Sequence, residues 1–131
     1  MTKGKEKMGQ VAKKLVKEAW DLEVFKRAYA VSLSIHKVSK SYPKDEIFAL
    51  TSQIRRASKS VCANLAEGFA KQEFSPAEFK RFISIAIGSA TEMRIWIRYS
   101  LDLGYINKEQ AKTWSQEYQT ITRMLRGLYG K

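Results

Sequence analysis

The chain has 131 residues, one cysteine, and 24 Lys plus Arg against 13 Asp plus Glu, which gives a formal net charge of +11 at pH 7. Its length predicts one domain with its own hydrophobic core, and the single Cys62 cannot form an internal disulfide. The sequence shows no apolar signal core and no run of about 18 apolar residues, which excludes a membrane span, so we expect a cytoplasmic protein. The positive charge predicts polyanionic partners, with nucleic acid ahead of acidic protein or anionic membrane; a charge that serves solubility alone is the alternative.

Residues 1–19 form a basic segment that is organised differently from the rest of the chain. We expect its start to be disordered, whereas Val11, Leu15 and Ala19 have the spacing of a short amphipathic helix that folds on a partner. A solvated lead-in to the first helix is an equal alternative. Residues 20–131 are expected to form the folded domain. The lysines of this segment that are candidate nucleic-acid contacts are Lys13, Lys14 and Lys17.

Start and stop signals divide the rest of the chain into four helices. Tyr42-Pro43 breaks an early helix. Ser75-Pro76 with Glu78 combines an N-cap, a first-turn proline and a capping box, and Leu103-Gly104 ends a helix before the cap at Asn107. Because no β alternation or hairpin turn is apparent, we predict an all-α, antiparallel up-and-down four-helix bundle. Its helices are expected over residues 21–41, 45–69, 76–103 and 108–128.

The helix predicted over residues 45–69 has three sides of different composition. Its apolar stripe spans about 80° and predicts the core face. Gln53 and Asn64 border this stripe, where half-buried amides need hydrogen-bond partners. Arg55 and Lys59 lie one turn apart on a basic side. The stripe contains Ile47, Leu50, Ile54, Ala57, Val61 and Leu65.

The helix predicted over residues 76–103 has two apolar faces, although a bundle buries only one. Which face belongs to the core stays open at this point. We assign the face with the larger aromatic residues, and weaker apolar positions on the first helix, to an oligomer interface, because exposed aromatic patches usually meet a partner. Scattered surface residues, or a patch covered by the N-terminal segment, are the alternatives. The candidate interface residues are Leu22, Tyr29, Leu33, Ile85, Ile95, Trp96, Tyr99 and Leu103.

Basic residues on several helices are candidate nucleic-acid contacts, since Lys and Arg bind phosphate groups. Arg98 and Asp102 are spaced for an ion pair within a helix, and Arg56 and Glu67 lie on one side of their helix, so part of this charge is expected to be neutralised internally. The sequence contains no zinc-finger, helix-turn-helix or RNA-recognition motif, so binding should follow backbone and shape rather than base sequence. Besides the N-terminal lysines, the candidates are Arg55, Arg56, Lys59, Lys71, Lys80, Arg81, Arg94, Arg98, Arg123 and Arg126.

The sequence offers no catalytic arrangement. His36 is the single histidine, and its helical neighbours Ser32, Ser39 and Lys40 complete no catalytic set, so we interpret it as a surface histidine. Glu-x-x-His metal spacing and glycine-rich phosphate loops are also missing. We therefore expect neither an enzyme nor a cofactor, metal or small-molecule site.

The segments LTSQIRRASKSVCANLAEGF, EFKRFISIAIGSATEMRIWI and DLGYINKEQ carry a family resemblance. Through them Trp20–Leu128 closely resembles the four-helix-bundle family known from intervening sequences of bacterial 23S ribosomal RNA genes. The resemblance implies a ring-shaped homopentamer with a basic surface, suspected nucleic-acid binding and no established enzymatic activity. It also makes Gln53, Asn64 and Glu67-Gly68 architectural. Related members are the accessory variability proteins of diversity-generating retroelements, which bind the reverse transcriptase and its template RNA.

These observations lead to two candidate functions. In the first, the protein is an oligomeric, non-enzymatic scaffold that binds structured RNA as an accessory subunit, with a reverse transcriptase as a candidate partner. In the second, the ring is a protein-interaction module encoded in a 23S intervening sequence, without direct RNA binding. The charge of +11 favours the first, and the lack of a base-reading motif keeps the second open.

Overall fold

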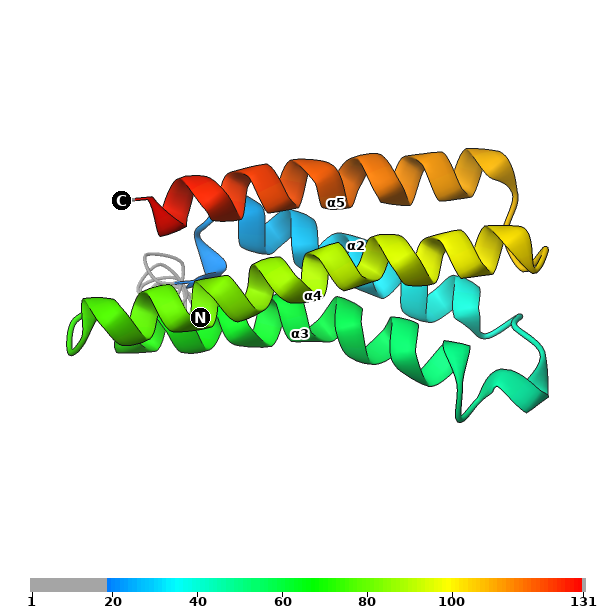
Figure 1. Ribbon diagram of the computed structural model, residues 1–131, viewed down its shortest axis with the longest axis horizontal. Helices are drawn as coiled ribbons and strands as arrows, with labels where there is room; N and C mark the ends of the chain where they lie inside the picture. The colour runs from blue at the N-terminus through cyan, green and yellow to red at the C-terminus, as the bar shows by residue number, and fades with distance from the viewer. Residues whose placement is uncertain (1–18, 131) are drawn as a thin grey trace, which may run out of the picture.

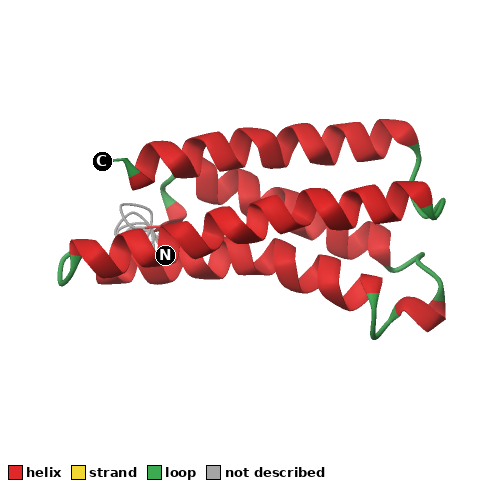
Figure 2. Ribbon diagram, in the orientation of Figure 1, coloured by secondary structure: helices red, strands yellow, loops and turns green. Residues whose placement is uncertain are grey.

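Four long helices make up the computed structural model, which describes residues 19–130 (Figures 1 and 2). The expected basic helix with Lys13, Lys14 and Lys17 lies outside these residues. The described part contains no strand, and the predicted all-α antiparallel four-helix bundle is confirmed. No helix in that part is long and apolar enough to cross a membrane. The helices are α2 (Glu23–Ser39), α3 (Leu50–Lys71), α4 (Pro76–Asp102) and α5 (Lys108–Tyr129), with a short 3-10 helix, η2 (Lys44–Glu46), between α2 and α3.

Side-chain caps start α4 and α5 as the sequence predicts. Ser75 Oγ accepts a hydrogen bond from the Glu78 amide at 3.2 Å, and Asn107 Oδ1 accepts one from the Gln110 amide at 2.7 Å. Each cap satisfies an amide that has no partner within its own helix. Between the two helices Gly104 has a φ of 81°, which glycine adopts without a steric penalty, so the chain reverses within a few residues.

The start of α3 differs from the prediction. The sequence predicts a helix from residue 45, but α3 begins at Leu50, and Ile47 of the predicted core stripe is 46% exposed. The Glu46 carboxylate explains the difference, because it accepts hydrogen bonds from the Tyr105 hydroxyl at 2.6 Å and, more weakly, from the Leu50 amide at 3.4 Å. These contacts hold η2 against the α4–α5 connection, and Ala49 leaves helical geometry with φ −126° and ψ −110°.

Each helix packs against two neighbours, as at the corners of a square. α3 and α2, α3 and α4, α4 and α5, and α2 and α5 are neighbours, whereas within residues 19–130 the backbones of the diagonal pairs α2–α4 and α3–α5 do not approach each other. Figure 1 shows the α2–α3 and α4–α5 connections at one end of the bundle and the α3–α4 turn at the other. The Tyr105–Glu46 hydrogen bond joins the two connections at their shared end.

The buried core identifies the inward face of α4. The stripe that begins at Phe79 and Ile83 is buried, and the face with the larger aromatic residues points outward. α3 and α4 approach closely at Gly68, where an added Cβ would lie 3.2 Å from Phe82 Cβ. Trp114 is the largest buried side chain. The other large, fully buried side chains are Tyr118, Ile35, Ile54, Val61, Leu65, Met93, Ile97, Ile121 and Leu125.

Candidate nucleic-acid interface

A basic groove lies between α4 and α5, near the end of the bundle where the two helices are connected. It has a volume of about 530 Å³ and carries Arg94 and Arg98 on α4 with Lys108 and Lys112 on α5. Arg98 pairs with Asp102 at 2.9 Å, as predicted, whereas the other three cations form no ion pair in the part of the chain that the structure describes. The remaining lining residues are Thr91, Ile95, Ile97, Leu101, Ala111 and Ser115.

The groove follows from helical spacing on two antiparallel helices. Arg94 and Arg98 are four residues apart on α4, and Lys108 and Lys112 are four apart on α5, so each pair lies along one side of its helix. The start of α5, at Lys108, adds the positive end of its helix dipole. Sequence reasoning missed both lysines, because only the α4–α5 register places them beside the arginines. Their own four-residue spacing was the available signal.

A second basic group, the α2–α3 cluster, comprises Arg55 and Lys59 on α3 and Lys40 at the end of α2, with the imidazole of His36 beside them. Arg55 Nε donates to Ser39 Oγ at 2.8 Å, and the Lys59 ammonium lies 2.9 Å from His36 Nδ1. Lys59, partial burial, Arg55 and Lys40 together lower the pKa of His36 below its ordinary value. His36 lies at the surface, partly covered by α3. The lowered pKa reflects a positive potential between α2 and α3.

His36→Gln is expected to reduce the acid sensitivity of the fold. Because the folded-state pKa of His36 lies below the unfolded one, the unfolded chain binds more protons below about pH 6.5, and stability falls as the pH drops through that region. Glutamine keeps an acceptor for Lys59 but does not titrate. Between about pH 7.5 and pH 5.5 the variant should lose less Tm than the wild type. An equal loss in both proteins would contradict the lowered pKa.

The remaining predicted cations lie outside the groove and the α2–α3 cluster. Arg56 lies on the same side of α3 as Glu67, which is several turns away and out of reach, and it pairs with Glu92 of α4 across the close α3–α4 contact. Arg81 pairs with Glu78 at 2.8 Å. The other four are exposed: Lys71, Lys80, Arg123 and Arg126.

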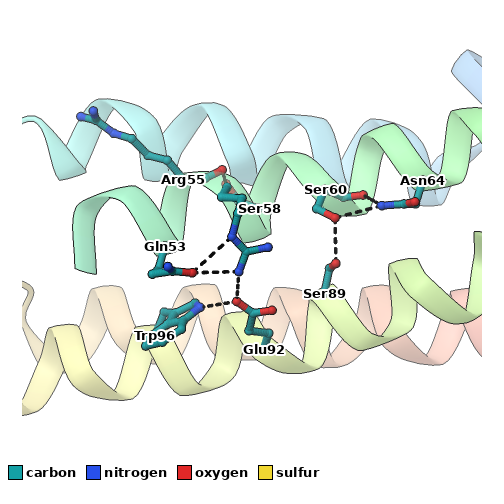
Figure 3. A network of polar contacts seen from close by, with 9 residues as sticks. Gln53, Arg55, Ser58, Ser60, Asn64, Ser89, Glu92 and Trp96 are labelled. Atoms are coloured by element: carbon teal, nitrogen blue, oxygen red, sulfur yellow. Dashed lines mark hydrogen bonds and ion pairs between the residues drawn. The ribbon is translucent and has the colours of Figure 1, made fainter. Parts of the chain in front are cut away.

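A polar network joins α3 to α4 around Glu92 (Figure 3). The Glu92 carboxylate accepts hydrogen bonds from the Arg56 guanidinium and, at 2.8 Å, from the Trp96 indole. Gln53 Oε1 accepts a second hydrogen bond from Arg56, at 2.9 Å. Arg56 and Gln53 therefore serve the contact between two helices, and Trp96 is partly withdrawn from the outer face.

The second amide on this side of α3 also has an architectural role. Asn64 Nδ2 donates to the Ser60 carbonyl and hydroxyl, each at 2.9 Å, and the hydroxyls of Ser60 and Ser89 lie 2.9 Å apart (Figure 3). Gly68 permits the close approach of α4 one turn farther on, whereas Glu67 is exposed. Asn64 and Gly68 thus match the architectural interpretation.

Apolar side chains are exposed on α4 and α2. Two residues of the predicted interface differ from the others, since Leu22 and Trp96 are partly buried against the core. Leu22 is partly buried at the N-terminal boundary of α2. Trp96 is partly buried because its indole donates a hydrogen bond to Glu92. α2 and α4 occupy diagonal corners, so their patches do not cover each other within one chain. The exposed members are Tyr29, Leu33, Ile85, Ile95, Tyr99 and Leu103.

The chemistry of these surfaces is cationic. Residues 19–130 contain no group of three His, Cys, Asp or Glu side chains placed to hold a metal ion. Cys62 is partly buried on α3, and burial raises the pKa of its thiol to about 11, so the reactive thiolate is scarce at neutral pH. The groove and the α2–α3 cluster are suited to binding anions.

The fold and these surfaces define a class: basic all-α four-helix bundles with clustered cations on their surface. Within that class, the sequence model of the family described as 23S rRNA-intervening sequence protein matches residues 20–127, and the chain belongs to this family. It is also similar to a solved protein of unknown function from the S23 ribosomal protein family of Bacteroides thetaiotaomicron VPI-5482, with a TM-score of 0.73 and 24% identity, covering 82% of this chain and 96% of that chain. That likeness shows the fold alone. The comparison with curated proteins found no match.

Proposed function

We propose that the protein is a non-enzymatic scaffold that binds the phosphate backbone of structured RNA as an oligomeric accessory subunit. The observation that carries this proposal is the groove between α4 and α5, where Arg94, Arg98, Lys108 and Lys112 share one concave surface. Membership of a family named for 23S rRNA intervening sequences is consistent with an RNA partner.

Binding through the groove rests on charge neutralisation. Each Lys or Arg that contacts a phosphate releases bound counterions, a gain that does not depend on base sequence. Arg94 and Arg98 can bind phosphate oxygens in pairs, whereas Lys108 and Lys112 act as point charges. The exposed Arg98–Asp102 pair contributes at most about 1 kcal/mol, so a phosphate can replace the carboxylate.

The oligomer would present this groove several times to one RNA. Apolar patches on the diagonal helices α2 and α4 fit a heterologous contact, in which the α4 patch of one chain meets the α2 patch of the next and the rotation closes a ring. The family resemblance gives five as the expected number of chains. Repetition around a ring raises the effective affinity of a modest site for a long polyanion.

A salt titration of RNA binding tests the proposal. We expect measurable affinity for a structured RNA at about 0.1 M salt and a slope of log K against log salt of about −3 or steeper, since each of the four groove cations contributes about −0.7 to −0.9. RNAs of the same shape and different sequence should bind alike, because no base is read. An affinity that is absent at about 0.1 M salt, or that does not fall as salt rises, rejects backbone binding.

A protein-interaction module is the second candidate function, and two exposed phenylalanine side chains favour it. Phe48 and Phe74 are 94% and 81% exposed, one before the start of α3 and one after its end. In this function the positive charge serves docking onto an acidic protein. The neighbouring genes distinguish the retroelement role from a protein encoded in a 23S intervening sequence. A reverse transcriptase gene beside two near-identical repeats supports the retroelement role, and a position within a 23S gene supports the intervening-sequence protein.

A further inference from the structure

A pocket at the junction of α2 and α3 lies apart from the α4–α5 groove and from the predicted oligomer interface. It has a volume of about 330 Å³, and Lys40, Lys44 and Arg55 bring three cationic side chains to its wall. Ser39 and Thr51 add two hydroxyl groups. No carboxylate is among the described residues that line it, so the pocket is positive on every charged side.

Arg55 is held in place with its terminal nitrogens available. Its Nε donates to Ser39 Oγ at 2.8 Å, and the same hydroxyl donates to the His36 carbonyl at 3.0 Å. Figure 3 shows the Arg55 side chain extending away from the network between α3 and α4. Within residues 19–130 its guanidinium makes no ion pair, so the outer edge keeps its donors for a ligand. A guanidinium held in this way can bind two oxygens of one anionic group with little further loss of side-chain entropy.

Thr51 provides an independent observation that points to a ligand. It is 2% exposed and lines the pocket, and its Oγ1 has no hydrogen-bond partner among the residues that the structure describes. Buried hydroxyls are normally partnered, since an unpartnered one costs about 1–3 kcal/mol. Thr51 also lies in the first turn of α3, which contains no acidic residue and carries the positive end of the helix dipole.

Glu46, the acid next to this helix start, is already engaged by two hydrogen bonds. One of its oxygens accepts from the Tyr105 hydroxyl at 2.6 Å, and the other accepts from the Leu50 amide at 3.4 Å. It is not among the residues that line the pocket. An anion in the pocket therefore meets three cations and a hydroxyl donor without facing a carboxylate across the cavity.

We propose that this pocket binds one phosphate group, held by the Arg55 guanidinium, the ammonium groups of Lys40 and Lys44, and the Thr51 hydroxyl. A doubly charged phosphate, either inorganic phosphate or the terminal phosphate of a nucleotide chain, matches three cations better than the singly charged diester of an RNA backbone. The site goes beyond the proposed RNA binding, because it uses none of the cations of the α4–α5 groove.

Calorimetric titration of the full chain with inorganic phosphate, at constant ionic strength, tests the pocket. We expect saturable binding of one phosphate per chain, weakened about tenfold by Thr51→Val and by Lys44→Gln. The matched control is Lys26→Gln, which removes an exposed lysine near the other end of α2 and should leave binding unchanged. Thr51→Val keeps the side-chain shape and removes an unpartnered hydroxyl, so its Tm should equal or exceed that of the wild type. Lost binding in that variant is then not a result of unfolding.

RNA oligonucleotides with and without a terminal phosphate identify the source of the group. About a tenfold preference for the phosphorylated RNA, abolished by Thr51→Val, assigns the pocket to an RNA end. Equal binding of both RNAs beside saturable binding of inorganic phosphate assigns it to free phosphate. Absence of saturable binding, or equal binding by Thr51→Val, Lys44→Gln and Lys26→Gln, overturns the proposal. The double variant Arg94→Glu with Lys112→Glu should retain phosphate binding in the pocket. Phosphate binding in the pocket and RNA binding in the groove can therefore be rejected independently.

Discussion

Replacing Arg94 and Lys112 with glutamate is expected to lower the affinity of the protein for structured RNA by about 100-fold, or about 2.7 kcal/mol. The change removes two phosphate contacts from the groove and leaves two carboxylates among the phosphates that remain bound. Fluorescence anisotropy at about 0.1 M salt measures the difference. Both side chains are exposed and form no ion pair in the described part of the chain, so the helical content should be unchanged.

A control with the same change in net charge separates the groove from the overall field. Lys26→Glu with Lys37→Glu alters two exposed lysines of α2, which do not line the groove. We expect it to weaken RNA binding by less than about tenfold, because only longer-range and screened interactions change. The neutral pair Arg94→Gln with Lys112→Gln should make the salt slope shallower by about two. Equal losses in the groove pair and the control pair would mean that net charge alone drives binding.

Replacing Tyr99 with glutamate is expected to abolish the oligomer. Tyr99 is 53% exposed on the outward apolar face of α4, and burying a carboxylate there without a partner costs several kcal/mol. In a ring-shaped oligomer every interface carries the substitution, so the ring does not assemble. Light scattering should then report the mass of a single chain, 15.1 kDa, instead of a multiple of it.

Phe74→Glu is the matched control for this substitution. It makes the same kind of change on a ring that is more exposed than Tyr99 but lies between α3 and α4 rather than on the outward face of α4. Circular dichroism should show equal helical content in both variants. Retention of the native mass by Tyr99→Glu, or its loss in both variants, would reject the α4 patch as the interface. If the oligomer is lost as expected, RNA affinity should fall with it, because the grooves no longer act together.

Local signals predict most of the fold. The caps at Ser75 and Asn107 place the starts of α4 and α5 at the residues observed, since a cap acts within one turn of its helix. The start of α3 is different, because it depends on a hydrogen bond between Glu46 and Tyr105, which are 59 residues apart in the chain. Without that contact, the acidic residues after Pro43 look like an ordinary first helical turn.

The candidate site is less predictable, because it depends on which side chains meet between helices. Arg94 and Arg98 are apparent from their spacing, whereas Lys108 and Lys112 gain their significance only from the α4–α5 register. Arg56 shows the same dependence. Its own helix offers no carboxylate within reach on that side, and the partner it uses lies 36 residues away, on α4.

Within a single chain, Glu92 sets the geometry of the outward face of α4. Its carboxylate binds Arg56 of α3 and the indole of Trp96, and the Trp96 ring lies with its centroid 5.9 Å from that of Tyr99. Side chains that are already immobilised in the free chain escape an ordering cost of about 0.5–1.5 kcal/mol each on association. The seam between α3 and α4 thus preorganises an aromatic pair, and in the proposed oligomer this pair would meet the neighbouring chain with less loss of side-chain entropy.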